Sequence, residues 1–295
     1  MKETSAGRLP SWFRLRFRST AENDRVKTLL RAGNLHTVCE SARCPNRQDC
    51  YNRGTTTVMI LGDVCTRNCR FCAVTHGIPL PPDPDEPRRV ADLAASLGLR
   101  HVVITSVTRD DLPDGGAGFF AETIHQVRSR ITATVEVLTP DFLGRTEALY
   151  RVLAAQPDVF NHNLETVRRL QAAIRPQADY TRSLDVLRRA AAWHPALLVK
   201  SGIMVGLGET DAEVREAMED LFRVGCRALT VGQYLAPSSA HRPVERYVPP
   251  DRFEDYADWA RSIGFIRVAS APLVRSSYHA AELLSRPLFQ PRDET

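Results

Sequence analysis

The chain has 295 residues, a length that suits one large α/β domain as well as two smaller ones. Its 39 basic and 35 acidic residues leave a net charge of +4, too small a surplus to indicate a nucleic-acid partner or a membrane surface. No apolar run is long enough for a signal peptide core or a membrane span, so we expect a cytoplasmic protein.

The N-terminal stretch precedes every predicted strand. Residues 1–9 are expected to form a disordered lead, and residues 10–18 mix aromatic side chains with arginines. That mixture suits a helix on a membrane surface or, as the alternative, a segment packed across the core. A short helix is predicted next, over residues 23–32.

A first set of three cysteines follows, at Cys39, Cys44 and Cys50, with the spacing C-x4-C-x5-C. Proline and asparagine residues around them predict a loop, and a loop can fold three thiolates around a metal centre. The set suits an iron–sulfur cluster whose fourth ligand is not cysteine. The alternative is a zinc site completed by His36.

A second set stands directly after a predicted buried strand over residues 56–61. Cys65, Cys69 and Cys72 have the spacing C-x3-C-x2-C, and soft thiolates suit iron–sulfur clusters or zinc. Three thiolates leave one iron of a 4Fe–4S cube open to an outside ligand. A structural zinc site would instead need a fourth ligand, such as His76.

The cysteine total supports metal binding. Six of the seven cysteines lie between Cys39 and Cys72, a poor arrangement for disulfides and a good one for metal ligands. Thiolate clusters also require a reducing compartment. Cys226 stands apart, between a predicted helix and a predicted strand, and we expect it to be an inert core residue.

The second cysteine set, with Phe71 before its last member, resembles the signature of the radical S-adenosylmethionine (SAM) family. In that family the open iron binds the amino and carboxylate groups of SAM. One electron then cleaves SAM to methionine and a 5′-deoxyadenosyl radical. The resemblance therefore implies a 4Fe–4S cluster held by Cys65, Cys69 and Cys72, with SAM as cofactor and no general acid or base among the catalytic groups.

Strands and helices are predicted to alternate along the rest of the chain. The predicted strands cover residues 56–61, 101–106, 133–138, 157–161, 198–205 and 228–234. The predicted helices cover residues 88–98, 117–130, 142–155, 165–173, 180–193, 211–224 and 251–263. Six strand–helix units predict an α/β fold, an incomplete (β/α)6 barrel of TIM type with its chemistry at the carboxyl ends of the strands.

Three segments are expected from this pattern. Residues 1–53 form an N-terminal extension that carries the first cysteine set, and residues 54–265 form the barrel. Residues 266–295 form a C-terminal tail that closes the mouth of the barrel, and from Ser270 on no further strand–helix pair is expected.

Polar groups follow several predicted strands. After the second strand, Asp110, Asp111 and Asp114 precede two glycines and suit either the ammonium group of SAM or a turn with an N-capped helix. After the fourth, His162 is more typical of a structural residue than of a catalytic one. The fifth strand carries the run KSGIMVGLGET, where Lys200 suits either a carboxylate of SAM or a structural position.

The run KSGIMVGLGET resembles the glycine-containing element that lines SAM in the radical SAM family. Together with the neighbouring strand ends, the resemblance implies one set of SAM-binding residues: Phe71, Thr105, Ser106, Asp110, Asn163, Glu165, Lys200, Gly202, Met204 and Gly206.

The tail contains the run VRSSYHA, which by itself would indicate a local turn, because oxygen is a poor ligand for iron–sulfur sites. Taken in order with LHTVCESARCPN, the second cysteine loop, TSVTRDDLPDGGA and VKSGIMVGLGET, it resembles the lipoyl-forming branch of the radical SAM family. The branch implies an auxiliary 4Fe–4S cluster held by Cys39, Cys44, Cys50 and Ser277. Tyr51 stands where the branch usually has tryptophan.

The branch also implies a reaction and its partners. Two sulfur atoms would enter carbons 6 and 8 of an octanoyl chain on a lysine of a lipoyl carrier domain, with the auxiliary cluster as sulfur source, so the chain would be a sulfurtransferase. The expected partners are octanoylated E2 subunits and the glycine cleavage H protein, an electron donor such as flavodoxin or ferredoxin, and an iron–sulfur carrier that rebuilds the cluster.

Two alternatives stay open at this point. Another radical SAM enzyme that inserts sulfur would keep the second cysteine set but lack the RSSY tail. A zinc-binding interaction module would keep all the cysteines and need no SAM.

Overall fold

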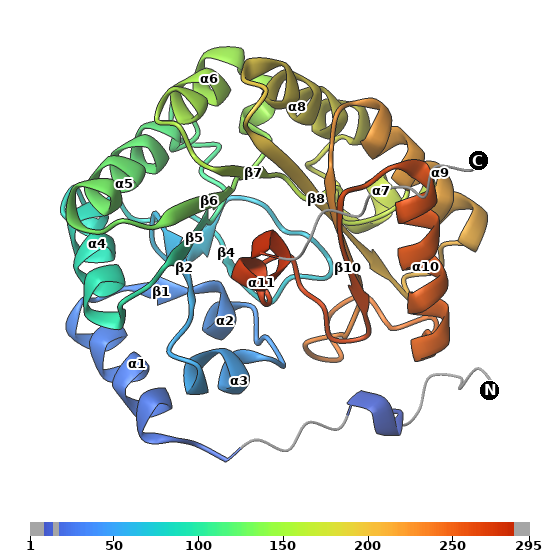
Figure 1. The fold of residues 1–295 in the computed structure, drawn as a ribbon, viewed down its shortest axis with the longest axis horizontal. Coiled ribbons are helices and arrows are strands. Elements are labelled where there is room, and N and C mark those ends of the chain that lie inside the picture. Colours follow the sequence, from blue (N-terminus) through green and yellow to red (C-terminus); the bar gives the residue numbers. More distant parts are fainter. Residues whose placement is uncertain (1–8, 14–17, 286–295) are drawn as a thin grey trace. The chain divides into compact units, whose positions relative to one another are not determined.

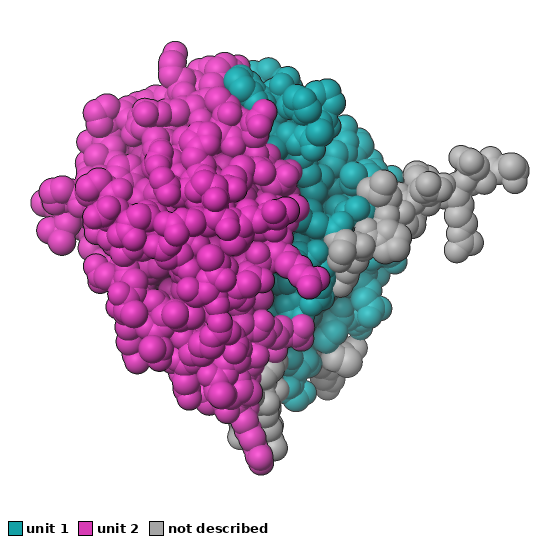
Figure 2. Space-filling view, turned by 60° about the vertical axis from the view of Figure 1, so that its left-hand side comes forward, with its two compact units in different colours: residues 1–14, 162–295 teal, residues 15–161 magenta. Residues whose placement is uncertain are grey.

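The computed structural model describes residues 9–13 and 18–285, so residues 1–8 of the predicted disordered lead lie outside it. The described residues divide into two compact units, coloured separately in Figure 2. Unit 1 takes the described residues among 1–14 and 162–295, and unit 2 takes those among 15–161. The segment boundaries predicted after residues 53 and 265 divide the chain by proposed role rather than by compactness. They therefore stay predictions.

Unit 2 is built on parallel strands with helices along their outer side (Figure 1). Its strands lie in the order β1 (His36–Thr37), β2 (Thr57–Ile60), β5 (His101–Ser106), β6 (Thr134–Leu138) and β7 (Val159–Asn161). Val58 pairs with Ile104 and Ile104 with Val137, all in parallel register, whereas β1 is antiparallel to β2. Every residue of β2 is buried, as expected for a parallel strand covered on both faces.

The longer helices of unit 2 include α1 (Ala21–Ala32), which precedes β1. Three others follow strands: α4 (Glu86–Leu97), α5 (Ala117–Arg130) and α6 (Thr146–Ala154), the last preceded by the short helix η2 (Phe142–Gly144). Helix α1 begins at Thr20, whose hydroxyl accepts the N–H of Asn23 and so satisfies one of the free donors at a helix start. Val90, Leu93 and Ala94 bury one face of α4.

Unit 1 contains the parallel strands β8 (Leu198–Val205), β9 (Ala228–Gln233) and β10 (Arg267–Ala271). Its helices are η3 (Arg168–Leu170), α7 (Gln171–Ile174), α8 (Tyr180–Trp193), α9 (Asp211–Arg223), α10 (Pro250–Ile263) and α11 (Ala280–Ser285). Helix α9 begins with a capping box, in which Thr210 and Glu213 each accept a backbone N–H of the other.

The six predicted strand–helix units are confirmed within a few residues, and the parallel strands confirm the α/β class of an incomplete TIM-type barrel. The prediction that the tail contains no further strand–helix pair is wrong, because β10 and α11 form one. Ala269, Ser270 and Ala271 are small residues with little strand signal, so pairing with β9 rather than local preference makes β10 a strand.

Two local predictions also need correction. The loop predicted around the first cysteine set contains the short helices α2 (Val38–Ser41) and α3 (Arg47–Asn52). The helix predicted to begin at residue 165 begins only at Arg168. Glu165 has a left-handed backbone (φ 71°), and its N–H and C=O bond to Gly202 and Met204 of β8, so it cannot enter a helix.

The segment before α1 packs partly into the core. Ser11–Phe13 forms a short 3₁₀ helix, η1, and the ring of Phe13 is buried against Tyr247 of the same unit, 5.8 Å between ring centroids. This contact favours the alternative of a core-packed segment, while residues 14–17 of the proposed membrane-surface helix lie outside the described residues. None of the helices in the described part of the chain has the length and hydropathy to cross a membrane.

Candidate metal and cofactor site

The end of β2 turns the chain sharply into the second cysteine loop. Leu61 (φ 69°) and Gly62 (φ 85°) both adopt the left-handed conformation, which glycine adopts freely and leucine only under constraint. The constraint comes from Glu86, whose carboxylate accepts the N–H of Leu61 at 2.6 Å. Burial raises the pKa of Glu86, although this hydrogen bond opposes the rise.

The second cysteine loop lies between two short strands. β3 (Val64–Cys65) pairs with β4 (Thr75–His76), and all three thiols are half-buried. Cys65 Sγ accepts the backbone N–H of Arg67 at 3.4 Å and that of Thr108 at 3.3 Å. Hydrogen bonds to a ligand sulfur are one way in which a protein tunes a bound iron–sulfur cluster.

A buried arginine anchors this loop. The guanidinium of Arg67 contacts Asp110 through Nε at 2.6 Å and Nη2 at 2.9 Å, and it contacts Asp141 at 2.6 Å. These carboxylates follow β5 and β6, so one side chain joins the cysteine loop to two strand ends. Local pattern did not single out Arg67 or Asp141. The only sequence signal was an arginine inside a cysteine loop.

The other acidic residues after β5 have structural partners. Asp114 accepts the N–H groups of Gly116 and Gly118 at 2.9 and 2.8 Å and so caps α5, which is the turn-and-cap alternative. Asp111 pairs with Arg109 at 2.8 Å. Asp110 already contacts Arg67, so its predicted contact with the SAM ammonium group stays a prediction that would require sharing.

The end of β5 offers a polar group that suits a bound cofactor. Thr105 Oγ1 donates to the carbonyl of Leu138 at 3.0 Å and therefore has a partner within the fold. Ser106 Oγ is buried and, within the described part of the chain, has no hydrogen-bond partner. A buried hydroxyl without a partner is costly, so its place at a strand end fits a polar group of a ligand such as SAM.

The first cysteine set includes a thiol that is more deeply buried than those of the second set. Cys39 is buried, whereas Cys44 and Cys50 are half-buried. Burial and then the neighbouring Cys44 thiol raise the pKa of Cys39 to about 11, and burial, Cys39 and Cys44 raise the pKa of Cys50. Close thiols that resist ionisation fit a metal cluster, because the positive charge of iron reverses this penalty.

One contact that supports the first cysteine set is a hydrogen bond between two neutral side chains. Thr37 caps α2 by accepting the N–H of Glu40 at 3.2 Å, and its hydroxyl also contacts Tyr51 Oη at 2.9 Å. Tyr51 is fully buried, and burial raises the pKa of its phenol. Over the described ranges, no group of three or more His, Cys, Asp or Glu side chains is arranged around a single-ion position.

Unit 1 brings together Asn163, Glu165 and Gly202 of the predicted SAM set. Asn163 Nδ2 donates to Glu165 Oε1 at 3.1 Å, while its Oδ1 is buried without a partner among the described residues. A Cβ on Gly202 would lie 2.8 Å from that oxygen and 2.7 Å from Thr230 Oγ1. Glycine is therefore required at position 202. Burial raises the pKa of Glu165 against the opposing charges of Arg175 and Arg275.

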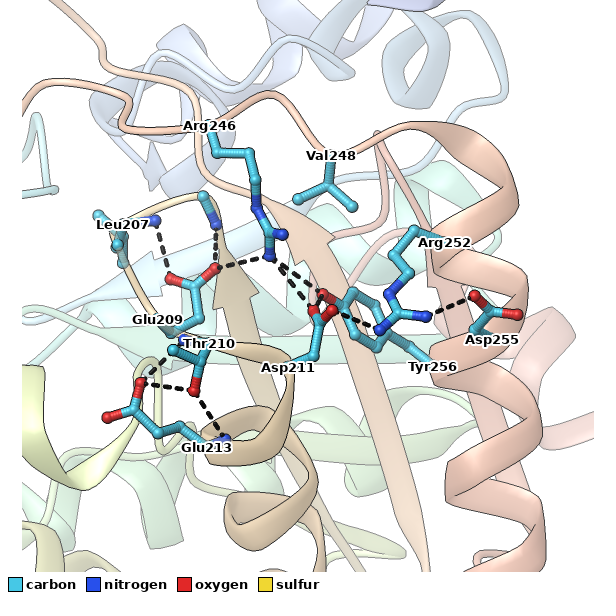
Figure 3. A network of polar contacts seen from close by, with 12 residues as sticks. Leu207, Glu209, Thr210, Asp211, Glu213, Arg246, Val248, Arg252, Asp255 and Tyr256 are labelled. Atoms are coloured by element: carbon cyan, nitrogen blue, oxygen red, sulfur yellow. Dashed lines mark hydrogen bonds and ion pairs between the residues drawn. The ribbon is translucent and has the colours of Figure 1, made fainter. Parts of the chain in front are cut away.

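The turn after β8 is fixed by Glu209 (Figure 3). Its carboxylate accepts the N–H of Gly206 at 2.6 Å and that of Leu207 at 2.9 Å. Gly206 has φ 99°, and a Cβ there would lie 2.0 Å from Gln233 Nε2, so only glycine fits. Glycine is therefore needed here because Gln233 and the backbone of Arg246 pack directly against the turn.

An ion network extends from this turn to α10 (Figure 3). Asp211 contacts Arg246 at 3.3 Å and also Arg252, and it accepts the hydroxyl of Tyr256 at 2.6 Å. Burial works to raise the pKa of Asp211, but the hydrogen bonds from Arg252 and Tyr256 outweigh it and hold that pKa below its usual range. The network ties the long segment between β9 and α10 to the start of α9.

Lys200 and His162 are both buried in unit 1. Lys200 Nζ donates to the carbonyl of Ser276 at 2.5 Å, which supports the structural alternative for this lysine. The N–H of His162 donates to the carbonyl of Lys200 at 3.2 Å, in keeping with a structural residue. Cys226 is confirmed as a core residue, since it is fully buried and burial raises its pKa.

The remaining predicted site residues lie in different settings. Phe71 is half-buried in the second cysteine loop, and Met204 is half-buried on β8 with its N–H bonded to Glu165 at 2.8 Å. Ser277 is half-buried in the tail. His76, the fourth ligand of the zinc alternative, is exposed on β4 opposite Cys65.

Parallel strands that alternate with helices, with this three-cysteine loop after the first of them, define a radical SAM protein. A family model of the radical SAM superfamily matches residues 59–221, and a model of the N-terminal domain of lipoyl synthase matches residues 1–44. Two solved structures share the fold, a methylornithine synthase (TM-score 0.51, 13% identity, 79% of this chain and 70% of that one) and TYW1 (0.53, 14%, 81% and 89%).

Curated relatives narrow the assignment. The lipoyl synthase of Caldanaerobacter subterraneus is 55% identical over 92% of this chain and 96% of its own length. That of Methylococcus capsulatus is 58% identical over 92% of this chain and 85% of its own. The chain belongs to the lipoyl synthase family of the radical SAM superfamily.

Proposed function

We propose that this chain builds a lipoyl group in place. It inserts two sulfur atoms at carbons 6 and 8 of an octanoyl chain that is amide-linked to a lysine of a lipoyl carrier domain. The observation that carries this proposal is the pair of three-cysteine sets combined with the RSSY run, in a chain 55–58% identical to lipoyl synthases over 92% of its length.

The substrate dictates the kind of chemistry. An unactivated C–H bond has neither an acidic proton nor an electrophilic centre, so general acids and bases have no role. When bound, the cofactors supply what is missing: the cluster on Cys65, Cys69 and Cys72 delivers an electron to SAM, whose radical fragment takes hydrogen from carbon, and the auxiliary cluster supplies sulfur.

The residues of the chain bind and orient these groups. Two backbone N–H groups donate to the sulfur of Cys65, one of the proposed cluster ligands. The partnerless oxygens of Ser106 and Asn163 would each offer a contact to a polar group of SAM, and glycine at positions 202 and 206 allows the close packing beside β8. We assign Cys39, Cys44, Cys50 and Ser277 to the auxiliary cluster, where a serine oxygen would bind iron weakly and suit a cluster that is dismantled.

The proposed reaction also implies which partners the chain needs and which compartment suits it. The substrate is an octanoylated carrier domain, such as an E2 subunit or the glycine cleavage H protein, because the reacting chain is attached to a protein lysine. A flavodoxin or ferredoxin would supply electrons, and an iron–sulfur carrier would rebuild the auxiliary cluster. A reducing cytoplasm suits the six clustered cysteines.

The test is an anaerobic reaction of the reconstituted protein with SAM, a reductant and an octanoylated carrier peptide, followed by mass spectrometry. We expect the peptide to gain two sulfur atoms with no net loss of hydrogen, because the reductant keeps the product as a dithiol. Oxidation of that dithiol to the cyclic disulfide should then remove two hydrogens. Roughly eight irons and eight sulfides per chain should accompany this activity, as two four-iron clusters require. A colourless zinc protein, or a product with a single sulfur as its end point, would contradict the proposal.

A second experiment tests the carrier. Free octanoate and the octanoylated carrier domain are compared at equal concentration, with the octanoylated peptide as an intermediate case. The proposal expects sulfur insertion into the carrier and none into octanoate. Equal turnover of the free acid would show that the attached lysine is not recognised.

A further inference from the structure

The chain after β10 returns across the other strands of unit 1. The N–H of Gln233, the last residue of β9, donates to the carbonyl of Pro272 at 3.2 Å. At Gly232 the two backbones touch, because a Cβ there would lie 2.1 Å from the carbonyl oxygen of Val274. These contacts fix the path of the tail up to the RSSY run.

Two side chains then donate hydrogen bonds to Ser276, the first serine of that run. Lys200 Nζ donates to the carbonyl of Ser276 at 2.5 Å, and Asn163 Nδ2 donates to its hydroxyl at 3.2 Å. Lys200 is only 1% exposed, and a buried ammonium group is retained only where it gains strong compensating contacts. The hydrogen bond to a backbone carbonyl of the tail is therefore one of the contacts that compensate for burying this charge.

We propose that Lys200 and Asn163 are positioning residues that hold the RSSY run through Ser276, so that the adjacent Ser277 is presented in one place with or without iron bound to it. The inference rests on the proposed role of Ser277 as a ligand of the auxiliary cluster. It gives Lys200 a task other than binding a carboxylate of SAM.

The grip on Ser276 solves a problem that the proposed reaction creates. When the auxiliary cluster gives up its sulfur, Ser277 loses its bond to iron. A tail held only by that bond would be released at every turnover and would have to be ordered again, at an entropic cost for each residue. Because Lys200 and Asn163 contact the neighbouring Ser276, the Ser277 hydroxyl can bind iron and dissociate from it while the backbone stays in place.

The first test measures hydrogen exchange of the full chain prepared without iron, so that neither cluster nor SAM contributes. The amides of Val274 and Tyr278 are the reporters, since they donate to Ala271 and Arg275 within the tail. Lys200→Met keeps the length of the side chain and removes its donor, and we expect exchange at these amides to become about tenfold faster or more. Lys200→Arg should restore part of the protection.

Two further variants control for folding. Lys27→Met removes a half-exposed lysine of α1, which forms a long ion pair of 3.6 Å with Asp24, and should leave exchange of the tail unchanged. Ser276→Ala removes only the hydroxyl held by Asn163 and leaves the interior of unit 1 intact. We expect it to speed exchange of the same amides by a smaller factor, about threefold to fivefold. Unchanged exchange in both Lys200→Met and Ser276→Ala would overturn the inference.

The second test uses the protein reconstituted with iron and sulfide. For Lys200→Met we expect the auxiliary cluster to be lost selectively, so that iron falls from roughly eight to roughly four per chain and the spectrum of the SAM-binding cluster remains. Faster tail exchange with all eight irons retained would confirm the grip and contradict Ser277 as a ligand. Slow tail exchange combined with weaker SAM binding would overturn the inference in favour of a SAM contact.

Discussion

The two cysteine sets of unit 2 use the same ligands in different surroundings. Cys65 is the last residue of β3, and Cys69 and Cys72 lie in the loop that leads to β4. All three thiols are half-buried, and Cys65 Sγ accepts two backbone N–H groups. Cys39 and Cys50 lie on short helices, where burial and neighbouring thiols raise their pKa values. The first arrangement provides hydrogen bonds to sulfur, whereas the second disfavours thiolates until iron is bound.

The side-chain contacts that anchor the two cysteine loops also differ. Arg67 holds the second loop through ion pairs with Asp110 and Asp141, all formed where water has little access. The first loop contains the neutral hydrogen bond between Thr37 and Tyr51 and an ion pair between Arg53 and Asp49, whose arginine is exposed. Under the proposed function, the cluster that must survive every turnover lies beside buried ion pairs, and the cluster that is consumed lies beside a neutral hydrogen bond and a more exposed ion pair.

Loss of Cys65 is expected to have the largest effect. Cys65→Ala removes the sulfur that two backbone N–H groups contact, so the proposed cluster that reduces SAM should be lost or misligated. Formation of 5′-deoxyadenosine, followed by chromatography, should fall to background. Cys226→Ala is the matched control, because it removes a cysteine that binds no proposed ligand, and it should retain cleavage. Cleavage by Cys65→Ala at the native rate would refute the assignment of this loop.

Ser277 tests the other set and should separate cleavage from product. Ser277→Ala leaves Cys65, Cys69 and Cys72 untouched, so SAM should still be cleaved while the lipoyl product fails. Ser277→Cys should give no rescue, because a better-held cluster releases its sulfur less readily. Both are measured by mass spectrometry of the carrier beside 5′-deoxyadenosine. A native yield of product from Ser277→Ala would show that the RSSY run is only a turn and provides no cluster ligand.

Arg67→Met tests the charged anchor. It removes the guanidinium that faces the buried carboxylate of Asp141, which should cost about 3–5 kcal/mol of unfolding free energy. Denaturant titration of the full chain measures the loss. Arg88→Met removes an exposed ion pair with Asp92 and should cost less than about 1 kcal/mol. Equal losses in the two variants would mean that the buried charges do not anchor the loop.

Tyr51→Phe tests the neutral anchor and should have the smallest effect. It keeps the ring and removes the hydroxyl that contacts Thr37, at a cost of about 1 kcal/mol. A double-mutant cycle with Thr37→Ala isolates this pair from the capping role of Thr37. Additive losses, with no coupling between the two variants, would show that the hydrogen bond contributes nothing.

Sequence pattern predicted what local residues decide. The alternation of β2, α4, β5 and α5 follows from apolar spacing, and the cysteine spacings predicted two metal-binding segments. Glycine at positions 202 and 206 was predicted to lie beside a cofactor. The structure adds that Asn163 and Gln233 crowd these positions from other elements, which no local pattern contains.

Contacts between distant residues could not be predicted in this way. Arg67 and Asp141 are 74 residues apart, and Lys200 and Ser276 are 76 residues apart. Neither pair belongs to a repeating pattern, and each forms only because parallel strands bring their ends to one edge. For the same reason Asp110 was predicted as a SAM contact, although the structure pairs it with an arginine of the cysteine loop.

The spacing of the ligands along the chain also sets an order of events during synthesis. Cys65, Cys69 and Cys72 leave the ribosome within about a second or two of one another, since translation adds about 5–20 residues per second. Ser277 follows Cys50 by more than two hundred residues, so the proposed fourth ligand of the auxiliary cluster emerges roughly 10 to 45 s after the third. The SAM-binding cluster can therefore be loaded on a nascent chain, whereas the auxiliary cluster has to wait for a finished one.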